Sequence, residues 1–171
     1  MSIFVLQMLL VLFSKKRIRN RTHVPNNFRR TKIEKYIGII ANFLWLFLLA
    51  YSIFLPLLFQ SIWFYLGLFA FIFGTLLLSF ATLRFITTPT DELIQSGVYK
   101  ISRHPMYLAT FLICLGAGVA SASFIFILLS VILFVCLYYE ARVEERYCHK
   151  IYKNLYEKYI HSVPRWVGFP R

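Results

Sequence analysis

Charged residues are absent from two long stretches of this chain. Lys, Arg, Asp and Glu do not occur between residues 36 and 83 or between residues 104 and 139. A helix that crosses a bilayer needs about 20 apolar residues. The first stretch therefore has room for two membrane helices, and the second fits a tight hairpin of two more. The pattern predicts four membrane-spanning helices.

Turn-forming residues predict where each stretch is interrupted. In the first, Pro56 and Gln60 break the apolar sequence LPLLFQSIW, and proline is unfavourable inside a helix. In the second, the small residues of GAGVASAS (116–123) are expected to form the turn. Each pair of helices leaves from and returns to a charged window. Windows 15–35, 84–103 and 140–171 are therefore predicted to lie on one side of the membrane.

Positive charge indicates which side that is. Window 15–35 holds nine Lys and Arg residues and window 140–171 holds seven, and loops rich in these residues stay in the cytoplasm. The apolar segment 2–13 precedes its charges, unlike a secretory signal. It is interpreted as a short fifth span, the alternative being an interfacial helix. The predicted class is an all-α integral membrane protein with about five transmembrane helices and a single membrane domain, residues 1–171.

Composition supports this class. The chain is 59% hydrophobic and 15% charged, whereas a soluble domain carries about 25% charged residues. The net charge of +12 is attributed to membrane topology and anionic lipid headgroups and not to nucleic-acid binding. Cys114, Cys136 and Cys148 lack the spacing of a disulfide framework or a metal site, and neither is predicted.

The middle polar window, RFITTPTDELIQSGVYKISRHPMY (84–107), has the features of a site. Pro89 and Gly97 interrupt any helix there. Pro105 suits the first turn of the following helix, because its missing N–H group is not needed at that position. His104 would then lie at a helix start, where free backbone N–H groups attract an anion such as a carboxylate.

The last window predicts an amphipathic helix. Its apolar and aromatic positions recur every four residues, at Tyr147, Ile151, Leu155 and Tyr159. Charged residues occupy the other face, at Lys150, Lys153, Glu157 and Lys158. Such a helix is expected to lie on the membrane surface on the cytoplasmic side.

Two blocks of sequence, LIQSGVYKISRHPMYLATFLICLG and EERYCHKIYKNLYEKYIHSVPRW, together resemble the isoprenylcysteine carboxyl methyltransferase family. Membrane phospholipid methyltransferases share much of this pattern. The first block is similar to the family's G-x-Y-x-x-x-R-H-P-x-Y. The second is similar to its E-E, aromatic-Gly-x-x-Y-x-x-Y and V-P-R elements, here at Glu144, Glu145, Tyr152, Tyr156, Tyr159, Val163, Pro164 and Arg165. The resemblance covers about residues 62–166.

The resemblance implies S-adenosylmethionine as methyl donor. No G-x-G-x-x-G follows a strand, so a Rossmann-like cofactor site is not expected. The residues that it implies for cofactor binding are Asp91, Glu92, Leu93, Ile94, Tyr99, His104, Pro105, Met106, Tyr107 and Glu144. Under this interpretation His104 holds the methionine carboxylate and Glu144 accepts hydrogen bonds from the ribose or the amino group. Tyr99 and Tyr107 offer aromatic faces to the adenine or the sulfonium.

The catalytic residues depend on the acceptor. A carboxylate acceptor is already ionised at neutral pH, and Arg142 or Arg103 would orient it. An amine acceptor must lose a proton, for which Glu145, Glu144 and Glu140 are the candidate bases. The carboxylate of an isoprenylcysteine-like or other lipophilic acceptor is preferred, because the two blocks resemble that family most closely. A phospholipid amine is the alternative.

Two departures from the family pattern keep a further alternative open. Lys153 stands where the family usually has glycine, and Glu140 stands where eukaryotic members have a substrate-contacting arginine. A non-catalytic membrane scaffold of the same fold is therefore a rival hypothesis. Transport is disfavoured because the apolar stretches contain few polar groups, among them Asn42 and Gln60.

Overall fold

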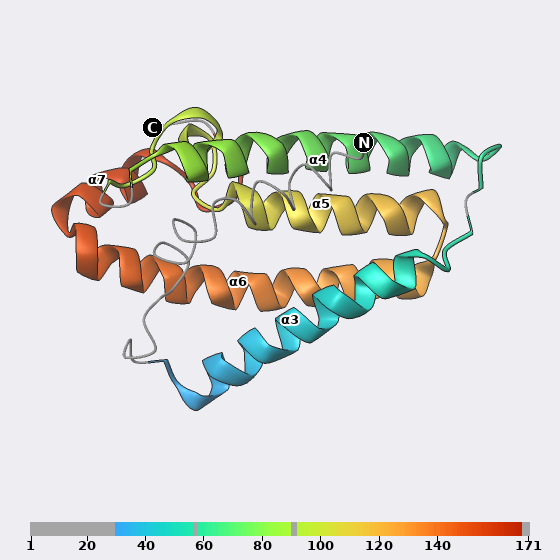
Figure 1. Cartoon of the computed structure of the whole chain (residues 1–171), viewed down its shortest axis with the longest axis horizontal. Helices are drawn as coiled ribbons and strands as arrows, with labels where there is room; N and C mark the ends of the chain where they lie inside the picture. The colour runs from blue at the N-terminus through green and yellow to red at the C-terminus, as the bar shows by residue number, and fades with distance from the viewer. Residues whose placement is uncertain (1–29, 57, 90–91, 169–171) are drawn as a thin grey trace.

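The computed structural model describes residues 30–56, 58–89 and 92–168, and these residues are helical without any strand (Figure 1). The helices are α3 (Lys32–Ser52), α4 (Ile62–Thr87), α5 (Pro105–Ala120), α6 (Phe124–Tyr152) and α7 (Asn154–Ser162), with the short 3-10 helix η1 (Gly97–Lys100) between α4 and α5. The all-α class predicted from the sequence is confirmed.

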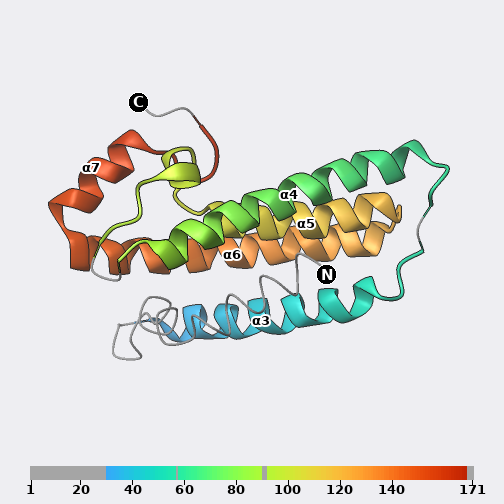
Figure 2. The same cartoon turned by 45° about the horizontal axis from the view of Figure 1, so that its top comes forward.

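The helices form a bundle whose polar segments gather at one end. α5 packs against both α4 and α6, and α3 packs on α6 (Figures 1 and 2). In both views the loop with η1, the start of α3, and α7 lie at one end of the bundle, while the α3–α4 and α5–α6 connections lie at the other. The predicted placement of the described polar segments on one side is confirmed. The side of the membrane that they face stays a prediction.

Among the described residues, three helices are long and apolar enough to cross a membrane, namely α3, α4 and α6. The fourth expected span, α5, is apolar but has 16 residues. Its length of about 24 Å is less than the hydrocarbon thickness of about 30 Å. Large side chains such as Phe43 and Phe69, which are 70% and 72% exposed, point away from the bundle, as expected of surfaces that contact lipid. Segment 2–13, the predicted fifth span, lies outside the described residues.

Glycines allow α4 and α5 to approach closely. A Cβ atom on Gly67 would lie 2.2 Å from the backbone nitrogen of Ala120, and one on Gly116 would lie 2.6 Å from that of Phe71. Membrane helices use small residues for such contacts. The hairpin turns within the predicted stretch 116–123, but α5 continues to Ala120, so that only residues 121–123 connect it to α6.

Polar contacts fix the start of α3 on α6. Thr31 and Glu34 form a capping box, in which each side chain accepts a hydrogen bond from the other's backbone N–H. Glu34 also pairs with Arg146 at 2.7 Å, and Arg30 pairs with Glu140 at 3.3 Å. Arg30 and the first turn of α3 are thereby attached to the polar end of α6.

The C-terminal amphipathic helix differs from its prediction. Lys153 has φ 44° and ψ −122°, which interrupts the helix between α6 and α7 and rotates the faces that follow. Ile151 and Leu155, expected on one apolar face with Tyr147 and Tyr159, are 47% and 61% exposed. Tyr156 and Tyr159 are buried instead. A C-terminal helix with apolar and charged faces is present as predicted, but the break at Lys153 divides the predicted face, and α7 packs Tyr156 and Tyr159 against the loop that precedes α5.

Candidate functional site

A cavity of about 310 Å³ lies at the polar end of the bundle, between the segment from η1 to α5 and the polar end of α6. Every described residue of the predicted cofactor set lines it: Glu92, Leu93, Ile94, Tyr99, His104, Pro105, Met106, Tyr107 and Glu144. Asp91, the remaining member of that set, lies outside the described residues. The fold thus brings together residues that are up to 52 positions apart in the sequence.

The cavity also has lining residues that the sequence reasoning did not assign to it. Tyr147 and Cys148 come from the same face of α6 as Glu144 and the candidate base Glu140, because residues three and four apart are neighbours on a helix. This spacing was a signal that could have found them. Arg30 lines the cavity from the start of α3, and no local pattern points to it because its position depends on tertiary packing.

The three predicted catalytic residues have different positions. Arg103 lines the cavity. Arg142 is exposed and is not part of the cavity wall, because two residues along a helix lead to its opposite side. Glu145 is buried, but it too is outside the cavity wall.

Glu145 is the centre of a buried cluster of ions. Arg165 donates to both of its oxygens, from Nε at 2.9 Å and from Nη2 at 2.6 Å. Arg103 Nη1 and His104 Nε2 each lie 3.2 Å from Glu145 Oε1. With both oxygens engaged in this way, Glu145 is suited to hold its neighbours in place, and the predicted role as a base does not match its position.

His104 lies between two carboxylates. Its Nδ1 is 3.5 Å from Glu144 Oε2, and its Nε2 contacts Glu145. Burial opposes a charge on the ring, but hydrogen bonds to Glu144 and then Glu145 outweigh this effect, so that the pKa of His104 is raised above its ordinary value. An imidazolium with two N–H donors satisfies both carboxylates.

The sequence Arg-His-Pro explains the position of the His104 ring at the start of α5. His104 is the N-cap residue of α5, and Pro105 occupies the first turn as predicted. The His104 backbone N–H donates to the Ser102 hydroxyl at 3.2 Å. The ring stacks on Tyr107, with centroids 5.6 Å apart and planes 6° apart. Position and orientation are therefore set by both the backbone and the neighbouring ring.

Tyrosines from the C-terminal segment hold the loop on the other side of the cavity. The Tyr159 hydroxyl donates to the backbone oxygen of Tyr99 at 2.7 Å, and the Tyr152 hydroxyl donates to that of Glu92 at 3.4 Å. Tyr156 and Tyr159 are both buried, with Leu93 packed against them. The second sequence block thus supports the first one directly.

The Arg103 side chain carries a donor suited to a ligand. It is 9% exposed, and its Nε atom is buried and has no hydrogen-bond partner among the described residues. Buried polar atoms are nearly always hydrogen-bonded. Arg103 also belongs to the cavity wall, which makes this donor a candidate contact for an anionic group of a bound molecule.

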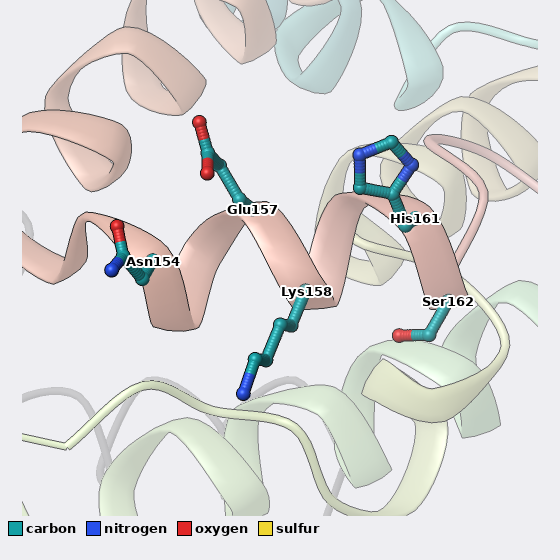
Figure 3. Close-up of a pocket in the computed structure, with 5 residues that line it drawn as sticks. All are labelled: Asn154, Glu157, Lys158, His161 and Ser162. Carbon is teal, nitrogen blue, oxygen red and sulfur yellow. The ribbon is translucent and has the colours of Figure 1, made fainter.

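A second hollow runs along α7 and is formed by side chains of that helix alone. Figure 3 shows its five residues, Asn154, Glu157, Lys158, His161 and Ser162. Glu157 and His161 point to one side of the helix, whereas Lys158 points to the other. The side chains do not converge, and the hollow is a surface feature without the geometry of a site.

The comparison with protein families identifies a match over residues 47–155, to the model described as phospholipid methyltransferase. The match covers more than half of the chain. The chain belongs to the phospholipid methyltransferase family. The matched part includes α4, α5 and the turn of α6 that carries Glu144 and Glu145. The comparison with curated proteins gave no match.

Membership of this family supports a membrane methyltransferase. Isoprenylcysteine methyltransferases belong to the same superfamily, so the resemblance seen in the sequence is confirmed at that broader level. The narrower assignment to the isoprenylcysteine family is not confirmed.

Proposed function

We propose that this membrane methyltransferase transfers a methyl group from S-adenosylmethionine to a lipophilic acceptor, and that the cavity at the polar end of the bundle holds the cofactor. The observation that carries the proposal is the convergence of the described cofactor residues on one cavity. The three long apolar helices would hold this cavity at the membrane surface, within reach of both a water-soluble cofactor and a lipid.

The residues present fit the cofactor. A volume of about 310 Å³ is within the range for sites that bind small molecules. The Arg103 Nε atom, which has no hydrogen-bond partner within the described part of the chain, suits the methionine carboxylate. Glu144 suits the ribose hydroxyls or the amino group, and Tyr99 and Tyr107 offer aromatic faces to the adenine or the sulfonium.

The protein's part in the reaction is mainly to position the reactants and to exclude water. Bound S-adenosylmethionine would supply a methyl group on a positively charged sulfur, so that in-line attack of the acceptor on the methyl carbon would release S-adenosylhomocysteine. Arg103, His104 and Glu144 would fix the cofactor, and the helices around the cavity would keep water away from the acceptor.

The charges around the cavity favour an amine acceptor over the carboxylate preferred from the sequence. Arg142, the residue expected to orient a carboxylate, is exposed on the opposite side of α6. Arg30 is paired with Glu140, and Arg103 is paired with Glu145. Glu140 and Glu144 both line the cavity, so either could accept the proton that an amine must lose.

A carboxylate acceptor is the second candidate. The observation in its favour is again the buried Arg103 Nε, which has no partner among the described residues and could orient the acceptor carboxylate. In that case no general base is needed, because the acceptor is already ionised at neutral pH.

Transfer of labelled methyl groups tests the function and separates the acceptors. Membranes containing the protein are incubated with methyl-labelled S-adenosylmethionine, and the extracted lipids are treated with base. Base releases the label of a methyl ester as methanol, whereas an N-methyl group keeps it. Base-stable label that is absent with Glu144→Gln supports amine methylation, and base-labile label supports carboxyl methylation. The absence of label in lipids of the source membrane would support the non-catalytic scaffold.

A further inference from the structure

The residues that follow α7 form a strap across the start of α5. We use the name C-terminal strap for residues 163–166. The backbone N–H of Arg103 donates to the backbone oxygen of Pro164 at 3.1 Å, and the Ser102 hydroxyl donates to that of Arg165 at 3.2 Å. Val163, at the start of the strap, is 6% exposed. The strap therefore runs directly beside the residues that precede Pro105.

The end of the strap packs against aromatic rings. The Trp166 ring centroid lies 4.8 Å from that of Phe134 and 6.1 Å from that of His104. The Arg165 guanidinium lies over the Tyr138 ring, 5.4 Å from its centroid. These contacts attach the strap to α6 and leave the Arg165 side chain directed at Glu145.

A series of ionic contacts leads from the strap to the cavity. Arg165 donates two hydrogen bonds to Glu145. Glu145 in turn contacts His104 Nε2, and His104 Nδ1 faces Glu144. The first two residues are not part of the cavity wall, whereas His104 and Glu144 are. Arg165 and Glu145 therefore have no direct contact with a molecule in the cavity.

We propose that Arg165 is a positioning residue, which fixes the Glu145 carboxylate so that Glu145 holds the His104 ring with Nδ1 facing Glu144 in the cavity. A hydrogen bond to one nitrogen of a histidine ring sets the tautomer and helps to fix the direction of the other nitrogen, and functional groups keep their geometry only when the surrounding residues fix them. A bidentate arginine supplies a fixed geometry for the carboxylate. The strap then couples the C-terminal end of the described chain to the site.

The protonation of His104 reports on this coupling without any ligand. The ionisable groups around His104, directly or through Glu145, come from α6, α5, the preceding loop and the strap: Glu144, Glu145, Tyr107, Arg103 and Arg165. The two carboxylates raise the pKa of the ring.

The ligand-free experiment is an NMR titration of ¹⁵N-histidine-labelled protein in nanodiscs. Glu145→Gln should lower the pKa of His104, because one carboxylate partner is lost. If Arg165 positions Glu145, Arg165→Gln lowers the pKa of His104 as well, because the carboxylate swings away. If Arg165 is only a counter-charge, its removal strengthens the field of Glu145 and the pKa of His104 rises. A rise or an unchanged pKa in Arg165→Gln overturns the proposal.

Matched variants keep this test interpretable. Lys158→Gln also removes one positive charge near the C-terminus, but Lys158 is exposed on α7, and it should leave the pKa of His104 unchanged. Arg165→Lys keeps the charge with fewer donors and is the second variant where Arg165→Gln does not fold. A smaller fall in the pKa of His104 is expected for it, and no fall at all contradicts the proposal.

The second readout, the affinity for S-adenosylhomocysteine, rests on the proposed function. Arg165→Gln should weaken the binding of S-adenosylhomocysteine about tenfold. Added to a protein that already carries Glu145→Gln, it should cause no further loss of affinity. If the two substitutions acted independently, their losses of affinity would add, and this result would contradict the proposal. If the wild-type protein binds no S-adenosylhomocysteine, the proposed function fails. The NMR titration still tests whether Arg165 positions Glu145.

Discussion

Arg103 and His104 are adjacent in the sequence and have separate tasks at the site. His104 is buried, the Arg103 side chain is only 9% exposed, and both contact Glu145. His104 turns its second nitrogen toward Glu144, while Arg103 keeps a buried Nε atom without a partner among the described residues. Arg103 and His104 therefore connect the cavity wall to the ion cluster around Glu145.

The stability of the protein should depend on the charge of His104. The pKa of His104 is raised in the folded protein, so its stabilising contribution is fully present below the ordinary pKa of about 6.5. It is lost as the pH rises through the raised value. The melting temperature in detergent should therefore fall as the pH rises above about 6.5 and through the raised pKa of His104.

His104→Gln is the comparison for this prediction. The variant lacks the titrating ring and should show a weaker dependence of melting temperature on pH above about 6.5. Identical pH profiles for wild type and variant would contradict the assignment of a stabilising charge to His104.

Glu144 and Arg142 offer a matched pair of substitutions on one helix. Glu144 lines the cavity, whereas Arg142 is exposed outside its wall. Glu144→Gln should weaken the binding of S-adenosylhomocysteine by about tenfold or more, the usual effect of losing a hydrogen bond to a charged group. Arg142→Gln should leave the affinity unchanged. Calorimetric titration measures both, and equal effects would contradict the placement of the cavity.

The residues of the cavity were largely predictable from the two sequence blocks, but their roles were less so. The motif around His104 identified one wall, and its position at a helix start followed from Pro105. Whether Glu144 or its neighbour Glu145 faces the cavity depends on how α6 is rotated in the bundle. The contribution of Arg30 depends on the packing of α3 on α6. Neither property is encoded in a local pattern.

At the scale of elements, the break between α6 and α7 determines which tyrosines reach the site. Lys153 adopts φ 44° and ψ −122°, a conformation that strains a residue with a side chain and suits glycine. Because of this break, the side chains of Tyr156 and Tyr159 point toward the protein interior, where both are buried. The family pattern has glycine at this position, which agrees with the backbone seen here.

Replacing Lys153 should therefore stabilise the protein. Lys153→Gly relieves a conformation that costs about 1 kcal/mol or more and should raise the melting temperature in detergent. Lys150→Gly is the control, since Lys150 is exposed within α6 and glycine inside a helix destabilises by about 1 kcal/mol. A lower melting temperature for Lys153→Gly would show that the break is unstrained.

The positions of the helices were predictable from the distribution of charged and turn-forming residues, with two exceptions. The α3–α4 break occurs around Pro56, as predicted. Gly116 was expected in a turn but lies within α5, because glycine in a membrane protein also serves close helix contact. The four-residue periodicity from Tyr147 assumed one continuous helix, and the left-handed conformation of Lys153 could not be foreseen from it.

At the scale of the whole molecule, the polar segments and the cavity occupy one end of the bundle (Figure 1). The distribution of Lys and Arg predicts that this end faces the cytoplasm. The opposite end contains the uncharged connections around Gln60 and residues 121–123.

Cysteine labelling tests this orientation. In a background without the native cysteines, Lys158→Cys should react with a membrane-impermeant thiol reagent only from the cytoplasmic side. Gln60→Cys should react only from the other side, since both positions are exposed and lie at opposite ends of the bundle. The reverse pattern would overturn the predicted orientation and leave the fold unaffected.

The most direct test of the account is a calorimetric titration of the purified wild-type protein with S-adenosylmethionine and S-adenosylhomocysteine. The account predicts saturable binding of both at one site per chain. A folded protein that binds neither compound, in detergent and again in lipid nanodiscs, would contradict the claim that the cavity around His104 and Glu144 holds this cofactor.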